Sequence, residues 1–214
     1  MNYSIIIYII GMILKIEAAF MLLPAVTALI YQETCGVAFL ITIVLCLAIG
    51  FPLTRKKPTR KAFYTKEGFV TVALSWIVLS IMGAIPFVIS RSIPNPVDAL
   101  FETVSGFTTT GASILSNVEA LPHCVLMWRS FTHWIGGMGV LVFILSLLPL
   151  TGGYHMNLMK AESPGPSVSK LAPKVQSTAK ILYTIYFVMT VIQIVLLLIG
   201  GMPLFDTICT AFGT

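Results

Sequence analysis

Long runs of apolar residues, separated by short polar stretches, dominate the chain. Five of these runs are long enough to cross a hydrocarbon core about 30 Å thick as helices. They cover residues 3–30, 36–53, 68–90, 124–150 and 181–202. The first also contains Lys15 and Glu17, which point to different faces of a helix. The pattern predicts a bundle of five membrane-spanning helices.

A further apolar segment, residues 96–107, is too short to cross the membrane. As a helix it would be roughly 18 Å long, against about 30 Å for the hydrocarbon core. Its start carries helix signals, because Asn95 can cap it, Pro96 suits the first helical position and Asp98 lies in the first turn. Glu102 places a second acid toward this positive end of the helix dipole. We expect the segment to enter the membrane and return to the same side.

Three threonines and a glycine, residues 108–111, follow this segment. The β-branched threonines disfavour further helix, and Gly111 can adopt backbone angles closed to other residues. We therefore expect the four residues to stand extended, with their carbonyls toward an axis. Carbonyl oxygens can replace the water around a cation without fixed full charges, and the absence of acids from the turn favours a monovalent ion. The alternative is that residues 108–113 are an ordinary external loop that caps the helix.

Basic residues gather in two polar stretches. Residues 54–67 and 151–180 hold ten of the thirteen lysines and arginines, so the positive-inside rule places both in the cytoplasm. Five spans then put the N-terminus in the cytoplasm, and the short segment enters from outside. The second stretch also suits contact with anionic membrane lipid.

A short internal repeat supports a pore. Residues 101–104, Phe-Glu-Thr-Val, are echoed by residues 205–208, Phe-Asp-Thr-Ile, and each follows a long apolar span. Both preceding spans run outward in the predicted topology, so the units are parallel repeats. Parallel repeats are related by an axis along the membrane normal, which can gather several turns around one hole. The alternative is a chance likeness between two apolar loops.

The composition of the chain argues against several classes of function. The chain is 57% hydrophobic and 10% charged, with a mean hydropathy of +0.95, against roughly 25% charged residues in soluble domains. The net charge of +5 is explained by the two basic stretches, so no nucleic-acid partner is expected. The four cysteines form no CxxC pair and are interpreted as packing residues, and the three histidines share no metal-ligand spacing. The chain has no HExxH, no GxSxG and no paired buried acids, which argues against an intramembrane enzyme.

Several motifs together resemble a known family. FETVSGFTTTGAS at residues 101–113, followed by PHCVLMWRSFTHWIGGMG at 122–139, is similar to the first pore repeat of the Trk/Ktr/HKT superfamily of potassium transporters, and in particular of its TrkH-type members. The resemblance extends over nearly the whole chain through LPAVTALIYQE at 23–33, KEGFVTVALSWIVL at 66–79, KAESPGP at 160–166 and GMPLFDT at 201–207.

The resemblance implies an all-α membrane protein, a helical bundle built from potassium-channel-like M1-P-M2 repeats. Residues 1–67 would supply two additional transmembrane helices and a basic cytoplasmic loop. Residues 68–150 would form the first complete repeat with its filter, residues 151–180 a cytoplasmic loop, and residues 181–214 the start of a second repeat. Potassium would be the transported substrate, with no cofactor.

The family's filter residues map onto the short turn. Gly111 matches the first filter glycine, and Thr108, Thr109 and Thr110 match the strand whose carbonyls face potassium. Thr109 and Thr110 are the residues expected at the ion itself. Arg129 in the fourth span either reaches the membrane surface with its charge or braces the filter from behind through backbone carbonyls.

A glycine-rich face on the fourth span, Gly136, Gly137 and Gly139, is expected to let helices approach closely. Nothing in it matches a nucleotide-binding loop, because no strand precedes it and a P-loop lysine is lacking.

The resemblance also implies a setting for the protein. It implies the plasma membrane of a bacterium, a cytosolic TrkA-type nucleotide-binding regulatory subunit as partner, and a homodimer when full length. The family's second filter glycine would lie past Thr214, so we expect this chain to be a fragment or a truncated gene product. The alternatives to potassium uptake are a non-conducting membrane scaffold and, less favoured, an intramembrane enzyme.

Overall fold

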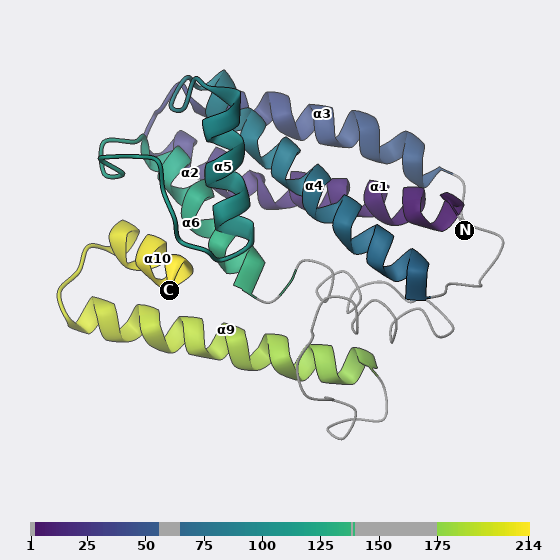
Figure 1. Ribbon diagram of the computed structural model, residues 1–214. Helices are drawn as coiled ribbons and strands as arrows, with labels where there is room; N and C mark the ends of the chain where they lie inside the picture. The colour runs from purple at the N-terminus through teal and green to yellow at the C-terminus, as the bar shows by residue number, and fades with distance from the viewer. Residues whose placement is uncertain (1–2, 56–64, 138, 140–174) are drawn as a thin grey trace.

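A computed structural model describes residues 3–55, 65–137, 139 and 175–214, and this part of the chain consists of helices and connecting loops, with no strand (Figure 1). The predicted all-α fold is confirmed. In chain order the helices are α1 (Tyr3–Phe20), α2 (Leu22–Ile30), α3 (Gly36–Thr54), α4 (Thr65–Ile89), α5 (Pro96–Phe107), α6 (His123–Gly137), α9 (Val175–Ile199) and α10 (Leu204–Gly213).

Four helical stretches among the described residues are long and apolar enough to cross a membrane. They are Tyr3–Ile30, Gly36–Thr54, Glu67–Ile89 and Ile181–Ile199, and they confirm four of the five predicted spans. The remaining one, residues 124–150, begins within α6. Its second half, from residue 140, lies outside the described residues.

The first predicted span is divided into α1 and α2 at Met21. Pro24 has no N–H and cannot make the helical bond to residue 20, so the hydrogen-bond ladder is interrupted here. The chain stays helical on both sides, because the N–H of Met21 donates to the carbonyl of Glu17 at 2.9 Å and that of Ala25 to the carbonyl of Met21 at 3.3 Å.

Helix α1 contacts both α3 and α4. Its buried face carries Ile9 and Ile13. Glycines bring α1 and α3 together, because a Cβ on Gly11 would lie 2.7 Å from the Cβ of Leu53, and one on Gly50 would lie 3.0 Å from the carbonyl oxygen of Gly11. Small residues at such a crossing let helices pack closely where lipid offers no hydrophobic driving force.

Helix α6 contacts α5 and α10, the two short helices that each follow a long one. The Trp128 ring lies 6.4 Å from that of Phe107 on α5, and the Phe131 ring lies 5.3 Å from that of Phe212 on α10. Each short helix follows a long one, α5 after α4 and α10 after α9, which is the order that the repeated sequence pattern requires. The grouping of these helices into pore repeats remains a prediction.

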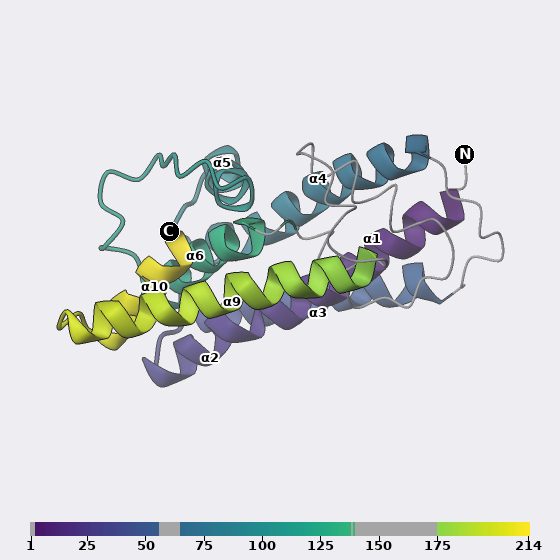
Figure 2. The same cartoon turned by 90° about the horizontal axis from the view of Figure 1, so that it is seen from below.

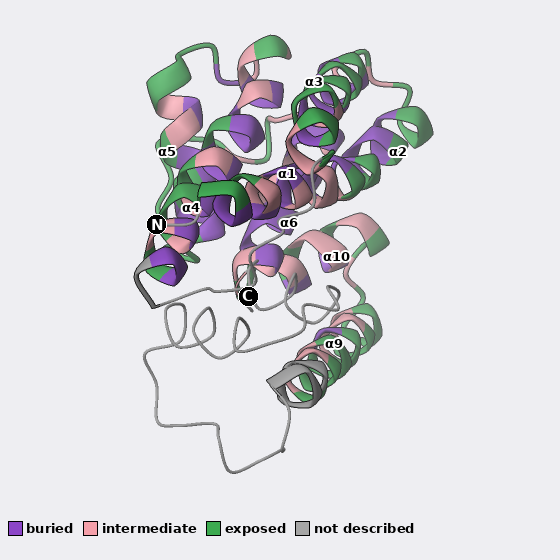
Figure 3. Ribbon diagram, turned by 90° about the vertical axis from the view of Figure 1, so that its right-hand side faces the viewer, coloured by how far each residue is buried: buried purple, intermediate pink, exposed green. Residues whose placement is uncertain are grey.

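Helix α9 lies at one side of the bundle, next to α10 (Figures 1 and 2). Much of its surface is exposed (Figure 3). It is joined to α6 by polar contacts: the Tyr186 hydroxyl donates to the carbonyl of Trp134 at 3.1 Å, and the Trp134 indole donates to the Thr190 hydroxyl at 3.1 Å. The apolar side chains on its outer surface suit contact with lipid.

Candidate functional site

Helix α5 begins and ends where the sequence predicted. Asn95 has extended backbone angles. Its side-chain oxygen accepts a hydrogen bond from the N–H of Val97 at 3.0 Å, which caps the helix. Pro96 occupies the first helical position and Asp98 lies in the first turn. With these residues at one end, the positive end of the helix dipole is stabilised and the negative end lies at Phe107.

The chain leaves α5 through a tight turn at Thr108 and Thr109. The N–H of Thr109 donates to the carbonyl of Gly106 at 3.0 Å, and the N–H of Thr110 donates to that of Ser105 at 2.9 Å. Thr109 has a left-handed backbone, with a φ of 54°. This pair of bonds around a left-handed residue is a Schellman motif, in which glycine normally occupies the left-handed position.

The expectation that residues 108–111 stand extended is wrong for Thr108, Thr109 and Gly111, because Thr108 has backbone angles outside the extended region and the other two have φ angles of 54° and 73°. Thr108 and Thr109 form the cap of α5 instead, because the turn satisfies the last carbonyls of the helix. A β-branched residue in the left-handed region is strained, and three threonine hydroxyl contacts accompany it. The Thr108 hydroxyl lies 2.8 Å from that of Thr110 and donates to the carbonyl of Val104 at 2.7 Å, while the Thr109 hydroxyl donates to the carbonyl of Thr108 at 2.7 Å.

Beyond this turn the chain continues without regular structure. Gly111 has a φ of 73°, and a Cβ built on it would meet no atom within 4 Å. Glycine is therefore required here for its backbone angle and not for space. Thr109, Thr110 and Gly111 are all exposed, and within the described part of the chain no hydrogen bond reaches their carbonyl oxygens. These oxygens are available to a ligand.

Glu102 holds the returning chain against α5. Its side chain is only 1% exposed. One carboxylate oxygen accepts hydrogen bonds from the Ser113 hydroxyl at 2.5 Å and from the N–H of Ile114 at 2.7 Å. A third hydrogen bond between the same two segments runs from the Ser105 hydroxyl to the carbonyl of Ala112 at 2.6 Å. The exposed turn is thus anchored on both sides by a buried polar network.

Arg129 completes this network from α6. Its Nε donates to the second carboxylate oxygen of Glu102 at 3.0 Å, and its side chain is 16% exposed. From the sequence we expected Glu102 near the start of the short helix and backbone carbonyls as the partners of Arg129. The structure places Glu102 in the middle of α5 and makes it the partner of Arg129. Two opposite charges in apolar segments signal such a pair, since intramembrane charges seek each other.

Glycines set the contact between α5 and α6 just behind the turn. A Cβ on Gly136 would lie 2.2 Å from the carbonyl oxygen of Phe107, and one on Gly106 would lie 2.1 Å from the Thr132 hydroxyl. A Cβ on Gly137 would lie 2.5 Å from the Tyr186 hydroxyl. The prediction that this glycine-rich face permits close approach is confirmed for Gly136 and Gly137. The last turn of α5 therefore rests directly on the backbone of α6.

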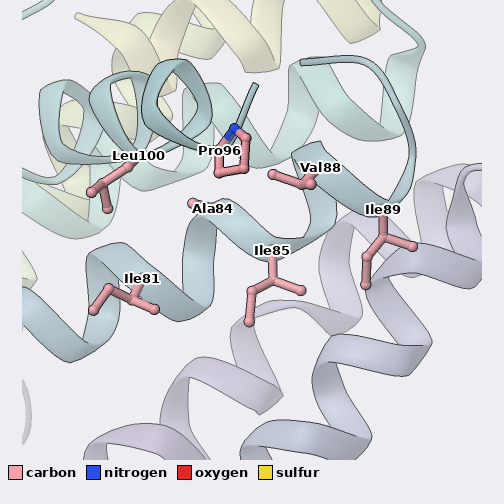
Figure 4. Close-up of a pocket in the computed structure, with 7 residues that line it drawn as sticks. All are labelled: Ile81, Ala84, Ile85, Val88, Ile89, Pro96 and Leu100. Carbon is pink, nitrogen blue, oxygen red and sulfur yellow. The ribbon is translucent and has the colours of Figure 1, made fainter. Parts of the chain in front are cut away.

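An apolar cavity of about 340 Å³ lies between α4 and α5 (Figure 4). Every side chain that lines it is apolar: Ile81, Ala84, Ile85, Val88, Ile89, Pro96 and Leu100. A cation cannot exchange its water for ligands here, so the cavity is not an ion path.

A second polar cluster lies at the start of α6. Cys35, just before α3, forms a disulfide with Cys124, so the interpretation of these two cysteines as packing residues is wrong. Glu33 accepts from the N–H of His123 at 2.8 Å and from the N–H of Cys124 at 2.9 Å, and it pairs with the His123 ring at 2.9 Å. Burial would raise the pKa of Glu33, but these hydrogen bonds outweigh it, so the pKa lies below its usual value.

Together these features define a class of protein: an all-helical membrane protein in which a short, capped helix presents an exposed carbonyl turn. Residues 35–212 match the family model described as TrkH, cation transport protein. The chain belongs to this family. The family is described as one of cation transport proteins, which agrees with the expectation that the chain is not an intramembrane enzyme.

Individual relatives agree with the family. The chain is 41% identical over 221 residues to the Trk system potassium uptake protein TrkH of Salmonella typhimurium, covering 100% of this chain and 45% of that protein. It is 36% identical over 217 residues to the Trk system potassium uptake protein TrkG of Escherichia coli, covering 100% of this chain and 44% of that protein. It thus spans less than half the length of these relatives.

A solved structure shares the fold. The crystal structure of the potassium transporter TrkH from Vibrio parahaemolyticus superposes with a TM-score of 0.80 at 32% sequence identity. The match covers 99% of this chain and 42% of that one. The arrangement of helices described above is therefore similar to the corresponding part of a solved potassium transporter.

Proposed function

We propose that the turn at residues 108–111 forms one side of a potassium path across the membrane. The observation that carries the proposal is the exposed, unpartnered set of carbonyl oxygens at Thr109, Thr110 and Gly111, held in place by the buried Glu102. The names of the relatives, potassium uptake proteins and a potassium transporter, support potassium as the ion. Other segments of the assembled pore supply its remaining sides.

The chemistry of the turn fits a monovalent cation. A ring of neutral carbonyls offers a dehydrated cation oxygen ligands without the strong field of carboxylates. Glu102 is the acid that the described residues place beside the turn, and its carboxylate is bonded to Arg129, Ser113 and Ile114. The negative charge of Glu102 is therefore neutralised by Arg129 and does not face the ion. The dipole of α5 adds a weaker negative potential at the turn.

The geometry of the turn depends on its supports. The left-handed Thr109 is a strained conformation, and such strain persists only where the surroundings over-determine it. Glu102 and Arg129 fix the loop segment that leaves the turn, while Gly136 lets α6 lie against the carbonyl of Phe107. We assign these residues to positioning the turn and the turn itself to contact with the ion.

We further propose the orientation and partners that the family suggests. The basic residues at 54–67 and 151–180 would face the cytoplasm, and the turn would open to the outside. A TrkA-type nucleotide-binding subunit would meet the cytoplasmic surface, with a homodimer as the assembled state. Residues 56–64 and 151–174 of these two basic stretches lie outside the described residues.

The experiment is potassium uptake by cells that lack their own uptake systems and express the complete reading frame. Gly111→Ser is compared with Gly201→Ser, because both glycines have a left-handed backbone (φ of 73° and 85°) and neither would bring a Cβ within 4 Å of another atom. The two changes impose similar strain, of about 1–3 kcal/mol. We expect Gly111→Ser to lower uptake or potassium selectivity at least tenfold relative to Gly201→Ser, at matched protein levels. Equal effects of the two changes would show that residue 111 has no special role in the path.

A further inference from the structure

The start of α6 is tied to the helices that precede α4 by one covalent bond. Cys35 lies in the connection between α2 and α3, and Cys124 is the second residue of α6. The disulfide joins residues 89 positions apart in the sequence. In the proposed orientation this end of the bundle lies outside the cytoplasm, where disulfides persist.

A carboxylate reinforces the same junction. Glu33 is two residues from Cys35, and its oxygens accept the N–H groups of His123 and Cys124, the first two residues of α6. These are orphan donors of a helix N-terminus, and a negative charge there also suits the dipole. The His123 ring stacks on Tyr31 at 3.9 Å and meets the edge of Phe205 on α10 at 4.8 Å. The first turn of α6 is thus held from three segments at once.

Contacts along α6 connect its first turn to the carbonyl turn at residues 108–111. Arg129 lies six residues after His123, about 9 Å along the helix, and it holds Glu102 behind the carbonyl turn. Between them, the Trp128 indole donates to the carbonyl of Gly83 on α4 at 2.9 Å. A shift of α6 at its first turn would therefore be passed to the Arg129–Glu102 pair.

We propose that the Cys35–Cys124 disulfide and Glu33 form a reducible clamp that positions α6 and, through Arg129, the carbonyl turn. An external dithiol opens the clamp by thiol–disulfide exchange. The dithiol supplies two electrons and two protons and becomes a cyclic disulfide, and the protein gains two free thiols. The effect of the clamp on the ion path rests on the proposed function, whereas its existence and its effect on stability do not.

A metal centre is the competing reading of the same cluster. Ligand atoms of Glu33, Cys35 and Cys124 lie within 4.8 Å of one another. Thiolates are the ligands that soft metals require, and the disulfide consumes both sulfurs. The clamp is therefore the better description.

The first test measures the bond directly in the purified full-length protein. Peptide mass mapping after maleimide treatment reports which thiols are free, with and without prior reduction by dithiothreitol. We expect Cys35 and Cys124 to be unlabelled before reduction and labelled after it, and the melting temperature to fall by roughly 5 °C or more on reduction. Labelling of both cysteines without reductant would overturn the proposal.

The second test separates the clamp from the transport proposal. A Cys35→Ser/Cys124→Ser double variant has no bond to reduce, so dithiothreitol should leave its melting temperature and its rubidium-over-sodium uptake ratio unchanged. In the unaltered protein, reduction should lower that ratio at least threefold, and Glu33→Gln should lower it further in the reduced state. A melting-temperature shift without any change in the ratio would refute the link to the ion path and leave the bond itself established. A reductant effect of equal size in the double variant would refute the clamp.

Discussion

The buried pair of Glu102 and Arg129 gives the sharpest prediction about the scaffold of the carbonyl turn. Arg129→Gln leaves a carboxylate that is 1% exposed without its positive partner, and breaking a buried pair costs about 3–5 kcal/mol. Because the Arg129 side chain is 16% exposed, water can reach the pair in part, and we expect the lower value, about 3 kcal/mol. Glu102→Gln keeps one acceptor oxygen for Ser113 and Ile114 but loses the charge-assisted hydrogen bonds. We expect it to lower the free energy of unfolding by about 2 kcal/mol.

The double variant Glu102→Gln/Arg129→Gln measures the interaction itself. Removing both charges removes the penalty of an unpaired buried charge, so we expect the double change to cost about 2 kcal/mol less than the sum of the single changes. The assay is the free energy of unfolding of the detergent-purified protein, measured by denaturant titration, with cation uptake measured in parallel. Uptake selectivity should fall in both single variants.

Asp98→Asn is the matched control, because Asp98 lies on the same helix and its carboxylate takes part in no ion pair within the described residues. Asp98→Asn should lower the free energy of unfolding by at most about 1 kcal/mol through the helix dipole. Combined with Arg129→Gln, its effect should equal the sum of the two single effects. Additive costs for Glu102 and Arg129 as well would refute the reasoning, because the pair would then carry no interaction energy.

Three further changes test other parts of the account. Thr109→Gly relieves a β-branched residue at a φ of 54° and should raise the free energy of unfolding by about 1 kcal/mol while lowering uptake selectivity; lower stability would mean that the threonine is not strained. Gly136→Ala places a Cβ 2.2 Å from the carbonyl oxygen of Phe107 and should cost about 1–3 kcal/mol by overpacking, measured by denaturant titration, so a neutral result would contradict the close contact. The folded-state pKa of Glu33 is lowered, so its contribution to stability is present above the unfolded-state pKa of about 4.3 and is lost as pH falls through the folded-state pKa. Below pH 5 the melting temperature should therefore fall less steeply with pH for Glu33→Gln than for the unaltered protein. Identical slopes for the two proteins would exclude this contribution.

Hydropathy and local helix signals were sufficient to predict the four spans found in the described residues and the short helix α5. Apolar runs of about 20 residues have few alternatives to crossing a membrane, and the Asn95–Pro96 start of α5 is local chemistry that any capped helix uses. The division of the first span at Met21 was missed, although Pro24 is the local signal for it.

Contacts between distant segments could not be read from the same patterns. The Cys35–Cys124 bond and the Glu102–Arg129 pair depend on where α6 crosses α2 and α5, and spacing along the chain does not encode a crossing. The turn at Thr109 was missed for a different reason. Glycine is the usual residue in that position of the motif, so a threonine there argued for an extended strand.

Substituted-cysteine labelling at the turn tests the central claim most directly. Thr110→Cys, in the full-length protein expressed in cells that lack potassium uptake, is treated from outside with a charged methanethiosulfonate reagent, with exposed Ser116→Cys in the same loop as control. If residues 108–111 line the ion path, modification at residue 110 blocks uptake, and external potassium slows that modification in a concentration-dependent way, whereas modification at residue 116 does neither. Modification at residue 110 that leaves uptake intact and proceeds at the same rate with or without potassium would contradict the account.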